Sequence, residues 1–169
     1  MAEGMDHGGL EAALLAYDGK TVSILSAVRS AHGADPDILS KLVTLCGHPD
    51  RLVSDGATWI LKAELEAGRG LDGRQTACLL AALPQLRGWQ GRLHLCQIIP
   101  ALTVTDAQRA TLRDWLAPFL DHDRPLLRAW ALDALCGVAD GAEIAVLLDR
   151  MEQDPAASVR ARVRALRRP

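Results

Sequence analysis

Apolar residues recur at steps of three and four along most of the chain. The run Leu79, Leu80, Leu83 and Leu86 is one example, and the stretch from Leu112 to Leu120 repeats the spacing. This period places the apolar side chains on one face of an α-helix. No segment shows the sustained apolar and polar alternation of a β-strand. The pattern therefore predicts an all-α chain.

Turn and capping residues divide the chain into segments of helical length. Pairs such as Asp35-Pro36, Asp140-Gly141 and Asp154-Pro155 recur between the periodic stretches. Asp caps a first helical turn, Pro fits the first helical position and Gly permits a helix to end. We therefore expect about ten short helices, each antiparallel to the next because the connections are short. Five are expected at residues 10–17, 37–46, 73–86, 106–120 and 142–152, and five alternate with these.

The alternating five share a nine-residue pattern, which indicates an internal repeat. Its copies begin at Lys20, Val53, Gly91, Leu127 and Val159, at steps of 33, 38, 36 and 32 residues. The fifth, eighth and ninth positions are apolar in every copy except at Arg167 in the last. These offsets form one helical stripe, which we expect to be buried. A polar residue at the end of such an array fits a terminal repeat, which no further repeat covers.

Two segments, DRPLLRAWALDALCGVA and DPAASVRARVRAL, resemble the HEAT-repeat family, particularly its short bacterial members. Both carry a loop acid, a helix arginine and an Ala/Leu stripe. The resemblance implies an α-solenoid of about five HEAT-like antiparallel helix pairs, forming one domain over residues 1–169 with residues 1–9 flexible. It also implies that the second helix of each pair lines a concave, partner-binding face. The copies at Lys20 and Val53 depart from it, with Thr21 and Ser54 at the arginine position.

The second position of the last three copies holds Arg92, Arg128 and Arg160. Arginine forms bidentate pairs with carboxylates, so one interpretation is structural, with these side chains bound to loop acids such as Asp123 and Asp154. The other is a groove that binds an anion or an acidic partner. The sequence leaves both interpretations open.

Other residues of the same helices complete a candidate surface. The fourth position holds His94 and Trp130, and Asp133 lies three residues beyond Trp130. An aromatic side chain on a concave face is a good anchor for a protein partner. We therefore predict a non-catalytic scaffold, with no cofactor and no metal, that binds a protein of unknown identity. The predicted site comprises Arg92, His94, Arg128, Trp130, Asp133 and Arg160.

The charge distribution does not favour nucleic acid as the partner. The formal net charge is −2, made up of −4 over residues 1–80 and +2 over residues 81–169. Duplex binding needs a broad basic surface, whereas the basic excess here is a short cluster of arginines from Arg160 to Arg168. No apolar run approaches a membrane span and no secretory signal opens the chain, so we expect a soluble cytoplasmic protein without membrane contact.

The remaining candidate chemistry has simpler explanations in the sequence. Four isolated cysteines without a CxxC pair are expected to be reduced core residues: Cys46, Cys78, Cys96 and Cys136. The histidines show no paired ligand spacing. We expect Trp115 in the core and Trp89 at the start of a helix, and we expect Trp59 and Trp130 beside the apolar stripe.

Three alternative functions stay open. Arg128, Trp130 and Asp133 resemble the Trp, Asp and Arg set of the HEAT-like DNA glycosylases, although Trp130 and Asp133 stand three residues apart. The C-terminal arginines could serve a nucleic-acid-binding module. Similarity of bacterial HEAT-like proteins to the bilin lyases of phycobilisomes implies a third alternative, a chromophore-attaching factor.

Overall fold

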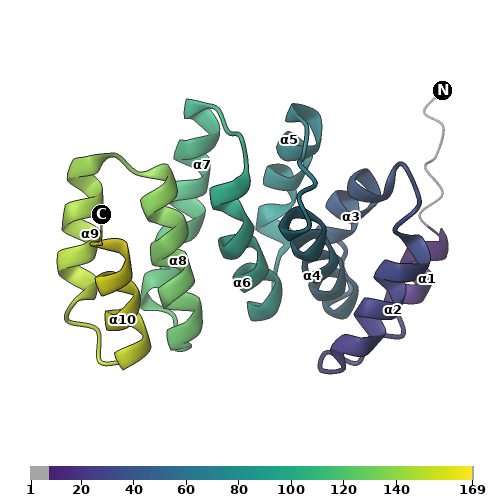
Figure 1. The fold of residues 1–169 in the computed structure, drawn as a ribbon, viewed down its shortest axis with the longest axis horizontal. Coiled ribbons are helices and arrows are strands. Elements are labelled where there is room, and N and C mark those ends of the chain that lie inside the picture. The colour runs from purple at the N-terminus through teal and green to yellow at the C-terminus, as the bar shows by residue number, and fades with distance from the viewer. Residues whose placement is uncertain (1–7, 169) are drawn as a thin grey trace. The chain divides into compact units, whose positions relative to one another are not determined.

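The computed structural model describes residues 8–168, which form ten α-helices and no strand (Figure 1). This confirms the all-helical prediction. The helices are α1 Gly8–Leu14, α2 Val22–His32, α3 Ile38–Cys46, α4 Arg51–Glu66, α5 Gly73–Ala82, α6 Trp89–Ile98, α7 Asp106–Leu116, α8 Pro125–Val138, α9 Gly141–Met151 and α10 Ala157–Leu166. None of the helices within residues 8–168 is long and apolar enough to cross a membrane.

Three helices pass at their C-terminal ends into short 3₁₀ segments, each containing a proline. These segments are η1 Leu83–Gln85, η2 Ile99–Ala101 and η3 Ala117–Asp121. Proline has no amide hydrogen to donate to the preceding turn, so Pro84 and Pro118 interrupt the α-helical hydrogen bonding. The sequence prediction of continuous helices over 73–86 and 106–120 is wrong at these ends for that reason.

The described residues cluster in two compact units that divide between His94 and Leu95, within α6. In the first unit α1 packs on α2, α3 packs on α4, and α2 and α4 pack on each other. In the second unit α7 packs on α8, α9 packs on α10, and α8 and α10 pack on each other. Each unit thus contains sequential helix pairs joined through their second helices. The predicted domain over 1–169 stays a prediction, and most of the segment expected to be flexible, residues 1–7, lies outside the described residues.

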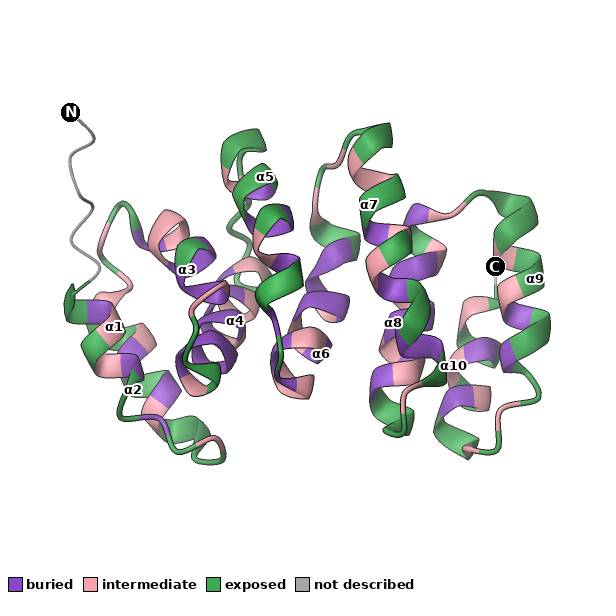
Figure 2. Ribbon diagram, turned by 180° about the vertical axis from the view of Figure 1, so that it is seen from behind, coloured by how far each residue is buried: buried purple, intermediate pink, exposed green. Residues whose placement is uncertain are grey.

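The predicted apolar stripe is buried in the three middle copies of the repeat. In Figure 2, α4 and α8 are coloured largely as buried. The buried stripe residues are Ala57, Ile60, Leu61, Leu95, Ile98, Ile99, Ala131, Ala134 and Leu135. In the last copy Val163 is buried, Leu166 is only half-buried and Arg167 is exposed. In the first copy the expected register is wrong, because α2 begins only at Val22 and buries Leu25 and Val28 while Ala27 is exposed.

Two predictions about the core need correction. Cys46 and Cys96 are buried, but Cys136 is half-buried and Cys78, in α5, is exposed. Trp115 is half-buried rather than internal, and its ring meets the ring of Phe119 edge to face at 4.8 Å between centroids. Cys78 and Trp115 lie in α5 and α7, whose buried residues occupy one face, so a residue beside that face keeps contact with solvent.

Candidate functional site

The three arginines at the second position of the repeat make the same local hydrogen bond. Arg92 donates from Nε to the carbonyl of Leu86 at 3.0 Å, and Arg128 and Arg160 donate from NH1 to the carbonyls of His122 and Asp154, each at 2.7 Å. The acceptor lies six residues before the arginine in every case. The side chain thus folds back over the turn that precedes its own helix and satisfies a carbonyl there. We call this contact the arginine turn bond.

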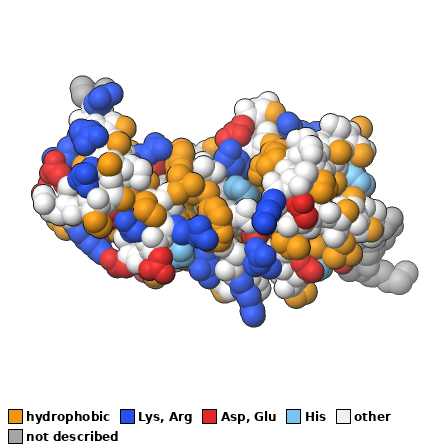
Figure 3. Space-filling model, turned by 90° about the horizontal axis from the view of Figure 1, so that it is seen from below, with side chains coloured by type: hydrophobic (Ala, Val, Ile, Leu, Met, Phe, Trp, Pro, Cys, Tyr) orange, Lys and Arg blue, Asp and Glu red, His pale blue; other side chains and the backbone are white. Residues whose placement is uncertain are grey.

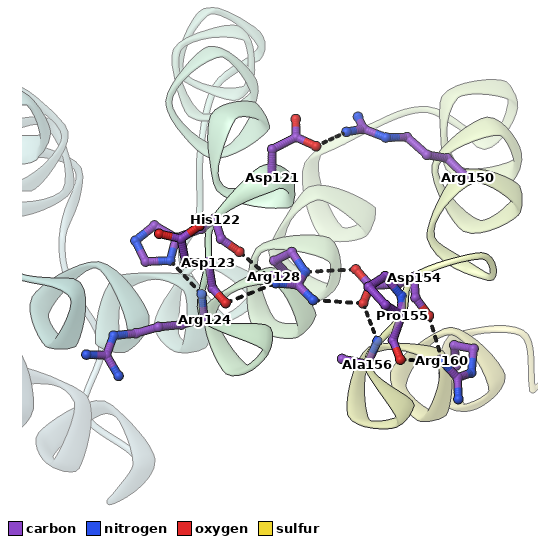
Figure 4. A network of polar contacts seen from close by, with 10 residues as sticks. All are labelled: Asp121, His122, Asp123, Arg124, Arg128, Arg150, Asp154, Pro155, Ala156 and Arg160. Atoms are coloured by element: carbon purple, nitrogen blue, oxygen red, sulfur yellow. Dashed lines mark hydrogen bonds and ion pairs between the residues drawn. The ribbon is translucent and has the colours of Figure 1, made fainter.

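Arg128 also joins two helix pairs of the second unit (Figure 4). Its Nε and NH2 donate to the two carboxylate oxygens of Asp154, both at 2.8 Å, and the side chains are only 11% and 7% exposed. The bond from Arg128 lowers the pKa of Asp154 below its ordinary value. The same carboxylate accepts the Ala156 amide just before α10. The structural interpretation of Arg128 is thereby supported, with Asp154 as the acid.

A different set of side chains lies on the solvent side of α8. Leu126, at 48% exposure, and half-buried Trp130 stand one turn apart. Asp133 follows on the next turn, and Arg162 reaches it from α10, with NH1 donating to Oδ1 at 3.1 Å. The guanidinium carbon of Arg162 lies 4.1 Å from the centre of the Trp130 ring, a cation–π contact. We call Leu126, Trp130, Asp133 and Arg162 the α8 face.

Trp130 and Asp133 therefore converge on one point, which their spacing of three residues left open. The convergence point is the guanidinium of Arg162, a residue absent from the predicted site. Its signal in the sequence was its position: Arg162 holds the fourth place of the last copy, the place that Trp130 holds one copy earlier. The second helices α8 and α10 pack together, so equivalent places on them become neighbours.

His94 belongs to the first unit and is largely enclosed there. Its Nδ1 lies 3.0 Å from Oγ1 of Thr58, which itself donates to the carbonyl of Asp55. Burial, assisted by the positive charge of Lys62, lowers the pKa of His94 to about 4. The imidazole is accordingly neutral at pH 7, and Arg92 and His94 are placed by contacts within this unit.

Asp55 is a buried carboxylate that the sequence prediction overlooked. It projects from α4 to the start of α6, where it accepts the amide of Gly91 at 2.9 Å, and Arg51 donates to its other oxygen at 3.0 Å. Burial raises the pKa of Asp55. A β-carbon at Gly88 would lie 2.3 Å from an oxygen of Asp55, so glycine is required there. Asp55 thus caps the start of a helix that lies 36 residues later in the sequence. The sequence signals were an acid among the apolar residues of one helix, and Gly88 and Gly91 at the start of the other.

A shallow apolar hollow of about 670 Å³ lies between α7 and α9 in the second unit. Leu135 of α8 and Ala139, which follows α8, contribute to it. Val146 also lines it and is 69% exposed, and Arg113 and Glu143, two further lining residues, pair at 2.8 Å. Among residues 8–168 no group of three or more His, Cys, Asp or Glu side chains is arranged to hold a metal ion. The structure thus offers two exposed apolar regions in this unit, the hollow and the α8 face.

Comparison with known proteins identifies no relative. No protein-family model, no curated protein and no solved structure matches the chain.

Proposed function

We propose that this chain is a scaffold of HEAT-like helix pairs, without catalytic activity, that binds a protein partner through the second helices of its pairs. Pairwise packing of sequential helices, and packing of second helices on each other within each unit, support the repeat assignment. The arginine turn bond supports it further, because one residue position performs one role in three copies.

The α8 face carries the binding part of this proposal. Arg92, Arg128 and Arg160 are engaged with backbone carbonyls, and Arg128 in addition with Asp154. The α8 face instead presents an exposed leucine, a half-buried tryptophan and a cation to solvent. Tryptophan and arginine are the residue types most enriched among those that dominate protein–protein binding energies. We place the partner contact there and treat Arg128 and Arg160 as its support.

The same contacts count against nucleic acid as the partner. Three of the C-terminal arginines are engaged within the chain: Arg160 with loop carbonyls, Arg162 with Asp133, and Arg167 with Asp149 and Glu152. On the face drawn in Figure 3, basic and acidic side chains are interspersed. A duplex-binding surface would need a field of one sign.

Affinity capture followed by direct binding tests the proposal. The tagged chain is used to capture proteins from an extract of its source, with and without nuclease, and the recovered candidate is then purified and titrated. We expect Trp130→Ala to weaken binding of the purified partner by about tenfold or more, as loss of an anchor residue does. Leu126→Glu, which changes an exposed side chain, is expected to act in the same direction without disturbing the core.

Val146→Ala on α9 is the matched control, since Val146 is an exposed apolar residue of the same unit outside the α8 face. Equal weakening by Val146→Ala and Trp130→Ala would contradict the placement of the site. Loss of every captured protein after nuclease treatment would contradict a protein partner.

A further inference from the structure

Trp130 and Asp133 form two walls around a positively charged group. The guanidinium carbon of Arg162 lies over the ring of Trp130, 4.1 Å from its centre, and NH1 of the same group donates a hydrogen bond to the Asp133 carboxylate at 3.1 Å. Both walls belong to α8, whereas the cation comes from α10. We call Trp130 and Asp133 the cation cradle.

The cradle suits a guanidinium better than other cations. A guanidinium is planar, so one face can lie on an aromatic ring while its N–H groups point outward to a carboxylate in the same plane. A lysine ammonium has no flat face, and it carries a more strongly held hydration shell. The carboxylate excludes an anionic ligand from the same place by repulsion. The geometry around Arg162 is thus that of a site for an arginine side chain.

Arg162 holds this place weakly in comparison with Arg128. The side chains of Asp133 and Arg162 are 20% and 29% exposed, so water reaches both. A partly exposed cation–π contact and a partly exposed ion pair together favour occupancy by roughly three- to thirtyfold. Arg128, in contrast, is shielded and donates to both carboxylate oxygens of Asp154 and to a carbonyl. Of Arg128 and Arg162, Arg162 is accordingly the arginine that can be displaced from its contacts.

We propose that the cation cradle of Trp130 and Asp133 binds an arginine side chain of the protein partner, and that Arg162 occupies the cradle until the partner arrives. This inference rests on the proposed function, because it assigns the chemistry by which the α8 face recognises its partner. Exposed Leu126, one turn before Trp130, then contacts apolar surface next to that arginine. The partner segment is therefore expected to carry an arginine beside an apolar residue.

The test uses N-acetyl-arginine amide as the probe and the full chain labelled with ¹⁵N. The chain has four tryptophans, and the indole signal of Trp130 is assigned by its loss in Trp130→Phe. We expect Arg162→Ala to give a saturable shift of this signal with the probe, at an affinity roughly three- to thirtyfold higher than in the unchanged chain. Arg164→Ala, which alters an exposed arginine of the same helix, is the matched control and should behave like the unchanged chain.

Charge recognition is tested with two further probes and one further variant. N-acetyl-citrulline amide has nearly the same shape as the arginine probe but no charge, and it should leave the Trp130 signal unshifted. Asp133→Asn, added to Arg162→Ala, should weaken binding of the arginine probe several-fold because the carboxylate wall is lost. 7-Methylguanosine presents a cationic base in place of a guanidinium and should bind more weakly than arginine.

Absence of a saturable Trp130 shift in a folded Arg162→Ala variant would overturn the inference, and so would equal binding of the citrulline probe. Stronger binding of 7-methylguanosine would overturn the assignment to arginine in favour of a nucleic-acid ligand. Failure of the probe while Trp130→Ala still abolishes partner binding would remove only the arginine assignment. Binding of the probe with no effect of Trp130→Ala on the partner would show that the cradle accepts arginine but does not contact the partner, and would overturn both the inference and the placement of the partner contact on the α8 face.

Discussion

Replacement of Arg128 by alanine is expected to lower the free energy of unfolding by about 2–4 kcal/mol. The variant loses two hydrogen bonds to the Asp154 carboxylate and the arginine turn bond to His122. It also leaves the carboxylate of Asp154, only 7% exposed, without its counter-charge.

The magnitude follows from how that pair is shielded. Removing one partner of a fully buried ion pair costs about 3–5 kcal/mol, whereas a surface pair contributes about 0–1 kcal/mol. The Arg128–Asp154 pair has little contact with solvent but lies close under the surface, and Asp154 retains the amide of Ala156 in the variant. The expected cost therefore lies below the fully buried value and well above the surface value.

Urea denaturation followed by far-ultraviolet circular dichroism measures the loss, which corresponds to a fall in midpoint of about 1–2 M for a typical urea dependence. Arg150→Ala is the matched control. Arg150 pairs with Asp121 at 2.6 Å, a shorter distance than in the Arg128 pair, but the two side chains are 50% and 74% exposed (Figure 4). We expect this variant to change the free energy of unfolding by less than about 1 kcal/mol.

The effect of Arg128→Ala also has a defined dependence on pH. Because Arg128 lowers the pKa of Asp154 in the folded chain, the contribution of the pair is complete above the unfolded value of about 3.9. It is lost as the pH falls through the lower folded value. The difference between the unchanged chain and Arg128→Ala should therefore shrink under acid conditions. A loss no greater than that of Arg150→Ala at pH 7 would refute the reasoning that shielding, rather than distance, sets the strength of the pair.

Three further predictions concern other buried groups. Gly88→Ala should lower the free energy of unfolding by about 1–3 kcal/mol, because the new methyl group would collide with Asp55. Gly73→Ala, with open space around the added methyl group, should change it little, and equal urea midpoints of the two variants would contradict this prediction. The imidazole of His94 should titrate in NMR with a pKa of about 4, so its contribution to stability is lost as the pH falls from about 6.5 towards that value. A titration midpoint near 6.5 would show that the ring is not enclosed. Cys78 should react first with a thiol reagent in the folded chain. Cys46 and Cys96 should react only on unfolding, because burial raises the pKa of both thiols, to about 12 for Cys96, and fast labelling of either in the folded chain would contradict their burial.

The helices could be predicted because their determinants are local. Apolar period and capping residues lie within each segment, and the side chains of Asp72, Thr105 and Asp140 cap the helices that follow them. The Arg128–Asp154 pair could also be predicted from the sequence, because the repeat places the loops of successive helix pairs next to each other.

Contacts between distant segments could not be predicted in the same way. Asp55 reads as an ordinary acid until the start of α6, 36 residues later, is seen to approach it. Likewise the role of Arg162 depends on the distance between α10 and α8, which the period of neither helix specifies. Proline ends such as those at Pro84 and Pro118 were readable in principle, because the residue that interrupts the helix is itself in the sequence.

The arginine turn bond has a consequence for how such a chain can be lengthened. Donor and acceptor of each bond lie within seven consecutive residues. A duplicated segment would therefore form its own arginine turn bond, whatever sequence lies on either side. Arg128 also links its helix pair to the next one. NH1 forms the arginine turn bond, and Nε and NH2 donate to Asp154, which lies in the loop before α10. Arg160 secures its turn with the same nitrogen. A designed helix pair grafted after α10, with an aspartate at the place of Asp154, would therefore meet an arginine already oriented to receive it.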